Sequence, residues 1–173
     1  SIDDTSLDGA DSISIGGSAT ASFLQGNGGN DSFVISSSVI SSSLYGGQGD
    51  DMVTVSLSAG SIATSTLAGS LGSDTLQLNN TNSVVSSAIY GSDATGTLAG
   101  NDSIFIAAGT IQTSSVYGGA GADTLLLSGG PNAATAQLIS VDFNAFAGSD
   151  SLSVVGSAVS STFNAGEGND TLF

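Results

Sequence analysis

The chain of 173 residues contains no lysine, arginine, histidine, cysteine or tryptophan, and only one proline. Without basic side chains it has no clamp for a phosphate, no amine for a Schiff base, no imidazole base and no counter-charge for nucleic acid. Kinases, triad hydrolases, enzymes of pyridoxal phosphate and nucleic-acid-binding proteins are therefore excluded, and we expect no enzyme. Without cysteine the chain has no disulfide and no soft ligand for a zinc or iron–sulfur site.

Every charged side chain is acidic, and the net charge is −15. Hydrophobic residues make up 39% of the chain, which favours a folded protein over a disordered one. No run of about 18 apolar residues predicts a membrane span, and the first residues lack the basic region of a signal peptide, so we interpret residues 1–173 as one segment of a longer repeat protein or fibre. A bound metal would have to be a hard cation, because carboxylates and carbonyls are the ligands that remain.

A motif of glycine, any residue and aspartate recurs eight times, and a polar residue or Met and then an apolar residue follow it. Most repeats are about 20 residues long, and the others carry insertions, which is the pattern of coils stacked on one another. The motif aspartates are Asp11, Asp31, Asp51, Asp74, Asp102, Asp123, Asp150 and Asp170, each two residues after a glycine.

Apolar residues stand two and four positions after each aspartate, and this period of two predicts a strand with one buried face. A second alternating stretch precedes the next glycines. The pattern predicts an all-β fold, a right-handed parallel β-solenoid of about eight coils of roughly 20 residues with two short strands per coil. Insertions at 79–83, 92–99 and 129–135 are expected to be corner loops, because Gly, Asn, Thr and the proline cluster there.

The glycine-rich corners read GGQGDD at 46–51 and GGAGAD at 118–123. These resemble the GGxGxD half of the nonapeptide repeat of RTX (repeats-in-toxin, hemolysin-type) proteins, whose parallel β-rolls bind Ca²⁺ in the glycine turns. The family places such a turn on both edges of each coil, whereas the second edge here is rich in serine. The corners that end in Asp102 and Asp150 keep one glycine each. The resemblance implies that the ligands are the eight motif carboxylates and glycine carbonyls, here those of Gly29, Gly49, Gly72, Gly121 and Gly168.

The charges support the same interpretation. Glycines allow carbonyls to turn inward, and Ca²⁺ takes six to eight oxygens. Equivalent aspartates on stacked coils would lie about 5 Å apart and repel one another, so we predict several Ca²⁺ ions between adjacent corners. The alternative is a plain turn in which the aspartate bonds its own backbone. Asp50, Asp93 and Glu167 are interpreted as solvated charges rather than ligands, with a supplementary role at a metal site as the alternative.

Tyr45, Tyr90 and Tyr117 each precede a glycine corner. A ladder of stacked rings is favoured for them, and stacking on carbohydrate is the alternative. Sequons at Asn30, Asn79, Asn101 and Asn169 leave glycans open, although most lie inside the corner motif.

An acidic solenoid without catalytic groups is typical of a scaffold. We predict an extracellular structural protein, stabilised by Ca²⁺, that associates with itself into a bacterial surface layer, matrix or filament. The resemblance implies a secreted or cell-surface protein exported by type I secretion. The alternatives are a stalk or ligand-binding segment of a giant RTX-like adhesin and, less favoured because no threonine stands three residues before any motif aspartate, an ice-binding segment.

Overall fold

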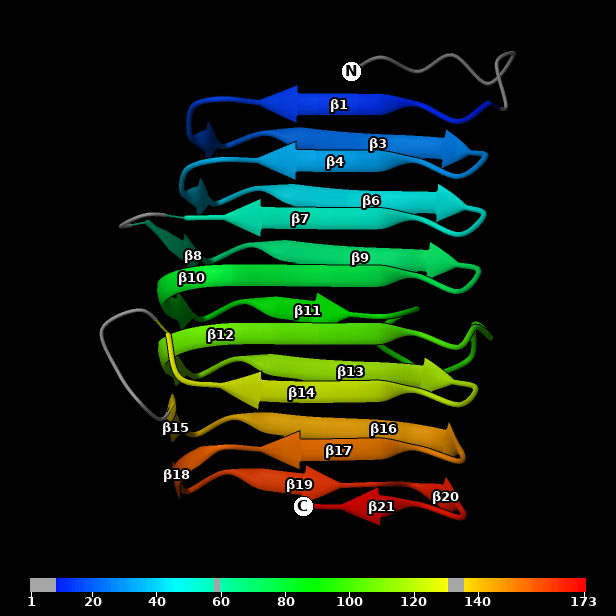
Figure 1. The fold of residues 1–173 in the computed structure, drawn as a ribbon, viewed down its shortest axis with the longest axis vertical. Coiled ribbons are helices and arrows are strands. Elements are labelled where there is room, and N and C mark those ends of the chain that lie inside the picture. The colour runs from blue at the N-terminus through cyan, green and yellow to red at the C-terminus, as the bar shows by residue number, and fades with distance from the viewer. Residues whose placement is uncertain (1–8, 58–59, 131–135) are drawn as a thin grey trace.

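A computed structural model describes residues 9–57, 60–130 and 136–173 of the chain. Over these ranges the chain winds as a stack of similar coils, with the N-terminal coil at one end and the C-terminal coil at the other (Figure 1). All strand pairs are parallel, and each strand pairs with its counterparts in the coils before and after it. The all-β parallel solenoid predicted from the repeat is confirmed. No helix in the described part of the chain is long and apolar enough to cross a membrane.

Each complete coil contributes strands to two sheets. The strand that follows the motif aspartate belongs to the first sheet, which in the described residues comprises β1 (Ser12–Ile15), β4 (Ser32–Ile35), β7 (Met52–Ser56), β10 (Thr75–Val85), β12 (Ser103–Gln112), β14 (Thr124–Ser128), β17 (Ser151–Val154) and β21 (Thr171–Leu172). Short strands continue this sheet at its far side, namely β2 (Ala19–Thr20), β5 (Val39–Ile40), β8 (Ser61–Ala63), β15 (Ala136–Ile139) and β18 (Gly156–Val159).

The second sheet runs back toward the next glycines. It comprises β3 (Phe23–Gly28), β6 (Ser43–Gln48), β9 (Thr66–Leu71), β11 (Ala88–Tyr90), β13 (Ser115–Ala120), β16 (Asp142–Gly148), β19 (Thr162–Asn164) and β20 (Glu167–Gly168) in the described residues. Two turns join the sheets in each coil. We name the turn that ends at the motif aspartate the glycine corner, and the turn that precedes the second-sheet strand the serine corner. Equivalent positions of the serine corner are occupied by Ser22, Ser42, Ser65, Ser87, Ser114, Val141 and Ser161.

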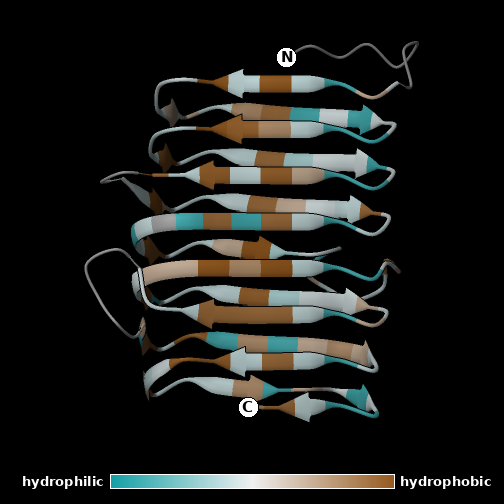
Figure 2. Cartoon of the chain, viewed as in Figure 1, coloured by the Kyte–Doolittle hydropathy of each residue, from teal (hydrophilic) through white to brown (hydrophobic). Residues whose placement is uncertain are grey.

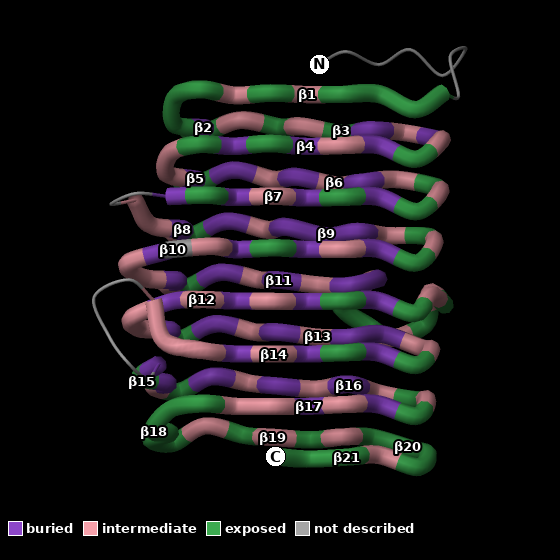
Figure 3. Tube along the Cα trace, viewed as in Figure 1, coloured by how far each residue is buried: buried purple, intermediate pink, exposed green. Residues whose placement is uncertain are grey.

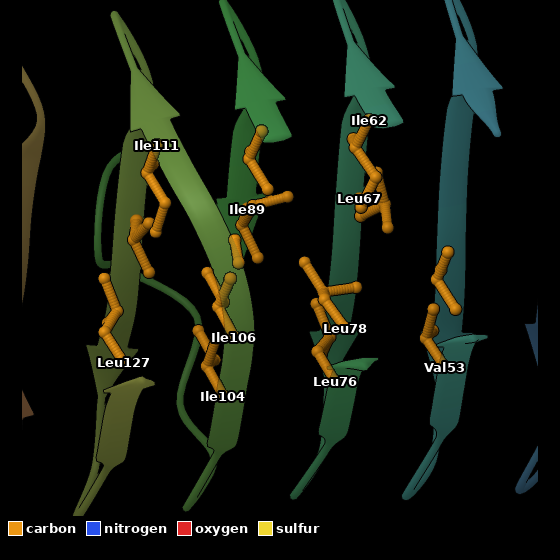
Figure 4. Packing of buried hydrophobic residues seen from close by; sticks show 14 of the residues in the cluster. Val53, Ile62, Leu67, Leu76, Leu78, Ile89, Ile104, Ile106, Ile111 and Leu127 are labelled. Atoms are coloured by element: carbon orange, nitrogen blue, oxygen red, sulfur yellow. The ribbon is translucent and has the colours of Figure 1, made fainter. Parts of the chain in front are cut away.

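The core is the space between the two sheets. Apolar side chains alternate with polar ones along several strands, such as β1 and β17, as Figure 2 shows by colour, whereas β14 is apolar over three consecutive residues; the inward residues stack in columns from coil to coil. Leu76 and Ile104 of the first sheet lie in one such column (Figure 4), which Leu125 continues by its register with Ile104, and Leu67 and Ile89 of the second sheet belong to the same core cluster. All five are fully buried. Burial of this continuous apolar column, rather than any ion pair, stabilises the stack.

The insertions differ from the expectation in one case. Residues 79–83 are not a loop, because β10 continues through them with a register shift against β12 between Leu78 and Thr81. The extra residues are absorbed as a bulge, which a parallel strand pair accommodates by bending. Residues 92–99 do leave the coil as a loop, and β11 is correspondingly short. In the third insertion, residues 131–135 lie outside the described residues.

Candidate metal centre at the glycine corners

The motif aspartates form one continuous hydrogen-bonded column inside the glycine corners. The backbone N–H of Asp31 donates to Oδ1 of Asp51 at 2.7 Å, and the N–H of Asp51 donates to Oδ1 of Asp74 at 2.7 Å. The same bond, 2.7 to 3.0 Å long, joins every other pair of consecutive aspartates from Asp11 to Asp170. From Asp31 onward, each carboxylate therefore has one oxygen fixed by the preceding coil.

The second carboxylate oxygen has no such partner in most coils. The Oδ2 atoms of Asp31, Asp51, Asp74, Asp123 and Asp150 are buried and accept no hydrogen bond. Figure 3 shows the buried segment that these residues form just inside each exposed turn. The fold thus places a column of unsatisfied acceptors along one edge. Burying a carboxylate oxygen without a hydrogen-bond donor or a cation costs free energy of folding.

The glycine five residues before the aspartate makes room for this oxygen. A Cβ on Gly46 would collide with Oδ2 of Asp51 and with the carbonyl oxygen of Gly69 in the next coil. The same pair of oxygens, one carboxylate and one carbonyl from the next coil, surrounds Gly26, where they come from Asp31 and Gly46. Only glycine leaves this space open, and the two oxygens that share it are both acceptors.

This donor set fits Ca²⁺. The ion takes carboxylate and backbone carbonyl oxygens, and both kinds converge here from adjacent coils without a donor between them. Within the described ranges no three carboxylates gather into one cluster, so each ion would have to complete its shell with carbonyls of the corner. The wholly oxygen-based site also agrees with a chain that has no soft ligands.

Burial also shifts the protonation of these carboxyls. In the metal-free fold, loss of solvent raises the pKa of Asp51 to about 6 and that of Asp74 and Asp123 to about 7, because the charged form is desolvated and neighbouring aspartates repel it. Burial likewise raises the pKa of Asp31 and Asp150. The fold thus holds carboxylates where their charge is unfavourable unless a proton or a cation compensates it.

The corner of Asp102 contains a feature that sequence reasoning missed. Gly91 occupies the place that Gly46 has beside Asp51, although the insertion at 92–99 separates it from the motif. In this corner the hydroxyl of Ser92 donates to Oδ2 of Asp102 at 2.9 Å. Asp102 is buried and its pKa is raised by burial, but its second oxygen is satisfied. Asp102 thus has, from Ser92, the hydrogen-bond donor that the Oδ2 atoms of the five other buried aspartates lack.

Other predicted ligands differ in their surroundings. We call the glycine five residues before a motif aspartate the cradle glycine. Beside Asp150 its position is taken by Ala145, which is fully buried, so a methyl group enters the space that is open in earlier coils. Asp11 is exposed and Asp170 is only partly buried. The corners are therefore not equivalent, and those of Asp31, Asp51 and Asp102 have both kinds of oxygen in place.

The five glycines predicted as carbonyl ligands form a separate column. Gly49 has φ 118°, and a Cβ there would collide with the carbonyl of Gly29 in the preceding coil. The equivalent contact recurs at Gly72, Gly121 and Gly168, each against the motif glycine one coil earlier. The carbonyl beside the free aspartate oxygen is instead that of the glycine five residues before the next aspartate. The doubled glycine in GGxGxD is the signal that could have identified it.

The three acidic side chains interpreted as solvated lie outside the column. Asp50 and Glu167 are exposed. Asp93 accepts hydrogen bonds from the hydroxyls of Thr95 and Thr97 and from the Thr97 N–H. Although partial burial acts to raise the pKa of Asp93, these bonds lower it below the ordinary value.

The serine corner repeats the geometry of the aspartate column with a neutral side chain. The N–H of Ser42 donates to Oγ of Ser65 at 3.1 Å, and the N–H of Ser65 donates to Oγ of Ser87 at 3.2 Å. Each hydroxyl also donates to a carbonyl two residues earlier, as Ser65 does to Ala63 at 2.8 Å. The preceding residue has a positive φ, 49° at Thr64. The sequence showed only that this edge is rich in serine.

A stack of parallel coils with an acidic, glycine-lined edge defines the class of the fold as a parallel β-solenoid of the β-roll type. The family model of the RTX calcium-binding nonapeptide repeat matches the chain in four copies, over residues 42–56, 106–132 and 154–173. The chain therefore carries RTX calcium-binding repeats, as its corner motifs predicted. The matched stretches include Asp51, Asp123 and Asp170. Neither a search of curated proteins nor one of solved structures found a match to the chain.

Proposed function

We propose that this chain is part of an extracellular structural protein whose solenoid is stabilised by Ca²⁺ bound along the glycine corners. The observation that carries the proposal is the column of buried Oδ2 atoms without a partner. A cation there would offset both the desolvation of the carboxylates and their mutual repulsion. No lysine, arginine or histidine exists in the chain to do so.

The proposed location follows from the same sites. RTX repeat proteins are generally secreted, and sites built from one carboxylate and several carbonyls suit a compartment where calcium is about millimolar. We infer export in a metal-poor unfolded form, by type I secretion, and folding outside the cell. The product would associate with itself into a layer, matrix or filament, because a rod of stacked coils is suited to repetition.

Circular dichroism in the far ultraviolet during a calcium titration, with magnesium as the control, tests the metal role. We expect a cooperative increase in β signal with Ca²⁺ and little response to Mg²⁺, which retains its waters and needs a tighter site. A β spectrum that ignores both ions and chelator would show that the corners are plain turns and would refute the proposal.

A variant locates the effect. Asp51→Ala is expected to lower the calcium stoichiometry by one or two ions, because its free oxygen lies beside the carbonyl of Gly69 in the next coil. Asp50→Ala is the matched control, since Asp50 is adjacent in sequence but exposed. Equal losses in the two variants would place the ions elsewhere. Sedimentation of the calcium-loaded chain then measures self-association, and a concentration-independent monomer would favour the stalk of an adhesin over a layer.

A further inference from the structure

One column of side chains on the outer face of the second sheet is aromatic but interrupted. The register aligns Tyr45 with Ala68, Ala68 with Tyr90, and Tyr90 with Tyr117. The rings of Tyr90 and Tyr117 stack with centroids 5.3 Å apart, and Tyr117 meets Phe146 edge-on at 5.3 Å. Of the three tyrosines predicted to form a ladder, Tyr90 and Tyr117 are therefore stacked, whereas Tyr45 instead meets Phe23 in a tilted contact. Between Tyr45 and Tyr90, alanine replaces one ring.

The missing ring leaves a slot in the surface. A cavity of about 350 Å³ lies there, which we call the slot; Tyr45, Ala68 and Tyr90 are among its lining residues, and Ala68 itself is only 2% exposed. The backbones of Tyr45 and Tyr90 are two strand spacings apart, roughly 9.5 Å, and two side chains projecting in parallel at that spacing would hold a flat ring roughly 4.8 Å from each. That separation is close to the 5.3 Å of the stacked pair beside it. Burial raises the pKa of the Tyr90 hydroxyl, and the nearby Tyr45 raises it further.

The insertion at 92–99 supplies one wall of the slot. β11 ends at Tyr90, shorter than the strands on either side of it (Figure 1), and the chain leaves the sheet there. Asp93, Ala94 and Leu98 of this loop line the slot. The Asp93 carboxylate is occupied by Thr95 and Thr97, and the Leu98 carbonyl accepts the N–H of Ala120 at 3.2 Å. At its other end the loop is bonded to the same coil, because the N–H of Ser92 donates to the carbonyl of Gly118 at 3.1 Å, and the slot is formed in advance of any ligand.

We propose that this slot binds one neutral pyranose ring with equatorial hydroxyls, held between Tyr45 and Tyr90. Such a sugar presents apolar C–H groups on both faces, which pack against aromatic rings, and hydroxyls along its edge. The edges of the slot offer the hydroxyls of Thr66 and Ser70. Thr66 lies two residues before Ala68 in β9, and Ser70 lies two residues after it.

Charge favours a neutral sugar. The chain has no lysine, arginine or histidine, so no side chain can form an ion pair with an anionic saccharide here. The single carboxylate in the lining is already hydrogen-bonded within its own loop. Two aromatic faces and neutral hydroxyls are the groups that remain for recognition.

Cellotetraose, a neutral chain of β-linked glucose units, is the probe. Saturation-transfer NMR and calorimetry on the calcium-loaded 173-residue chain measure its binding, and tyrosine emission reports it independently because the chain has no tryptophan. Tyr45→Ala should weaken binding about tenfold, since it removes one stacking face. Ala68→Phe should abolish it by filling the slot. Tyr117→Ala is the matched control and should change affinity by less than about twofold, because Tyr117 does not line the slot.

Each result decides the question. No transfer to cellotetraose in the folded wild type would overturn the proposal, and so would binding that Ala68→Phe leaves intact. Binding of indole without cellotetraose would show an aromatic-ligand site in place of a sugar site. Circular dichroism confirms that each variant is folded. If Tyr45→Ala does not fold, Ala68→Phe decides alone. Because folding is read separately, failure of the sugar site and failure of the calcium role remain distinguishable.

Discussion

In both corners of most coils, a side-chain oxygen accepts a backbone N–H of the preceding coil, but the side chains differ. At the serine corner, Oγ of Ser65 accepts the N–H of Ser42 and its hydroxyl donates to the carbonyl of Ala63. At the glycine corner, Oδ1 of Asp74 accepts the N–H of Asp51, but Oδ2 has no partner. A neutral oxygen therefore suffices to close a corner. The second carboxylate oxygen is more than the turn requires, and this surplus is what points to a cation.

The largest effect should come from pH, because it acts on the whole aspartate column. In the metal-free fold the pKa values of Asp51, Asp74 and Asp123 are about 6, 7 and 7, above the ordinary value of 3.8. The folded state therefore holds protons that the unfolded state releases. Stability should be highest in acid and should fall as pH rises from about 4 through about 7. Far-ultraviolet circular dichroism of the chain in chelator across this pH range measures this, as a loss of β signal when the pH rises.

Saturating Ca²⁺ provides the contrast for that experiment. Ligand carboxylates must be deprotonated to bind, so calcium should stabilise the fold more at neutral pH than in acid. The serine corner does not titrate in this range and cannot contribute. Metal-free stability that rises between about pH 4 and pH 7 would contradict the buried, unpaired state of the column.

The second largest effect should come from moving a carboxylate to the serine corner. Ser65→Asp places a charge at a buried site where the hydroxyl donates to Ala63, a bond that a carboxylate cannot make. We expect a loss of about 3 kcal/mol or more, measured by denaturation. Calcium should not rescue this variant, because no cradle glycine adjoins it. Ser65→Ala is the control and should cost about 1 kcal/mol. Rescue by calcium would show that any buried carboxylate at a corner creates a site.

The reverse exchange should have a smaller effect whose sign depends on calcium. Asp51→Asn keeps the Oδ1 acceptor and directs an amide donor toward the carbonyl of Gly69. Without metal, the variant should be more stable than the wild type by about 1 kcal/mol. With saturating calcium, it should be the less stable of the two. Melting temperatures with calcium and with chelator test this, and the same sign in both conditions would argue against a metal at this corner.

Much of the fold was readable because a solenoid repeats its constraints in sequence. The alternation after each motif aspartate predicted the buried faces, and residues such as Leu76 and Ile104 lie in the core as expected. The bulge in β10 was not predictable, because Asn and Thr at 79–83 have the composition of a loop. Pairing with β12 on one side and with β7 and β8 on the other overrides that local preference.

The site was predicted in its charges but not in its partners. The repeat placed the eight aspartates at equivalent corners, yet only the coil geometry shows that Gly91 serves the corner of Asp102 across the insertion. Ser92 could not be paired with Asp102 from sequence, because ten residues separate them. The column of serines could not be predicted either, because each bond from a serine N–H to the next serine Oγ joins residues about one coil apart.

The smallest expected effect on stability concerns a second row of side chains at the glycine corner, next to the aspartate column. The residue before each of several motif aspartates also bridges coils, but on the exposed side: Asn101 accepts the N–H of Ala122 at 2.8 Å, and Asp50 accepts that of Ser73 at 2.9 Å. Asn30, Asp50, Ser73 and Asn101 accept this bond, whereas alanine stands at the same position in two other repeats, so the position requires neither the charge nor the bond. Asn101→Ala should cost about 0.5 kcal/mol, equally with and without calcium. A lower calcium stoichiometry in this variant would extend the metal site to the outer row, and an unchanged one would confine it to the buried column.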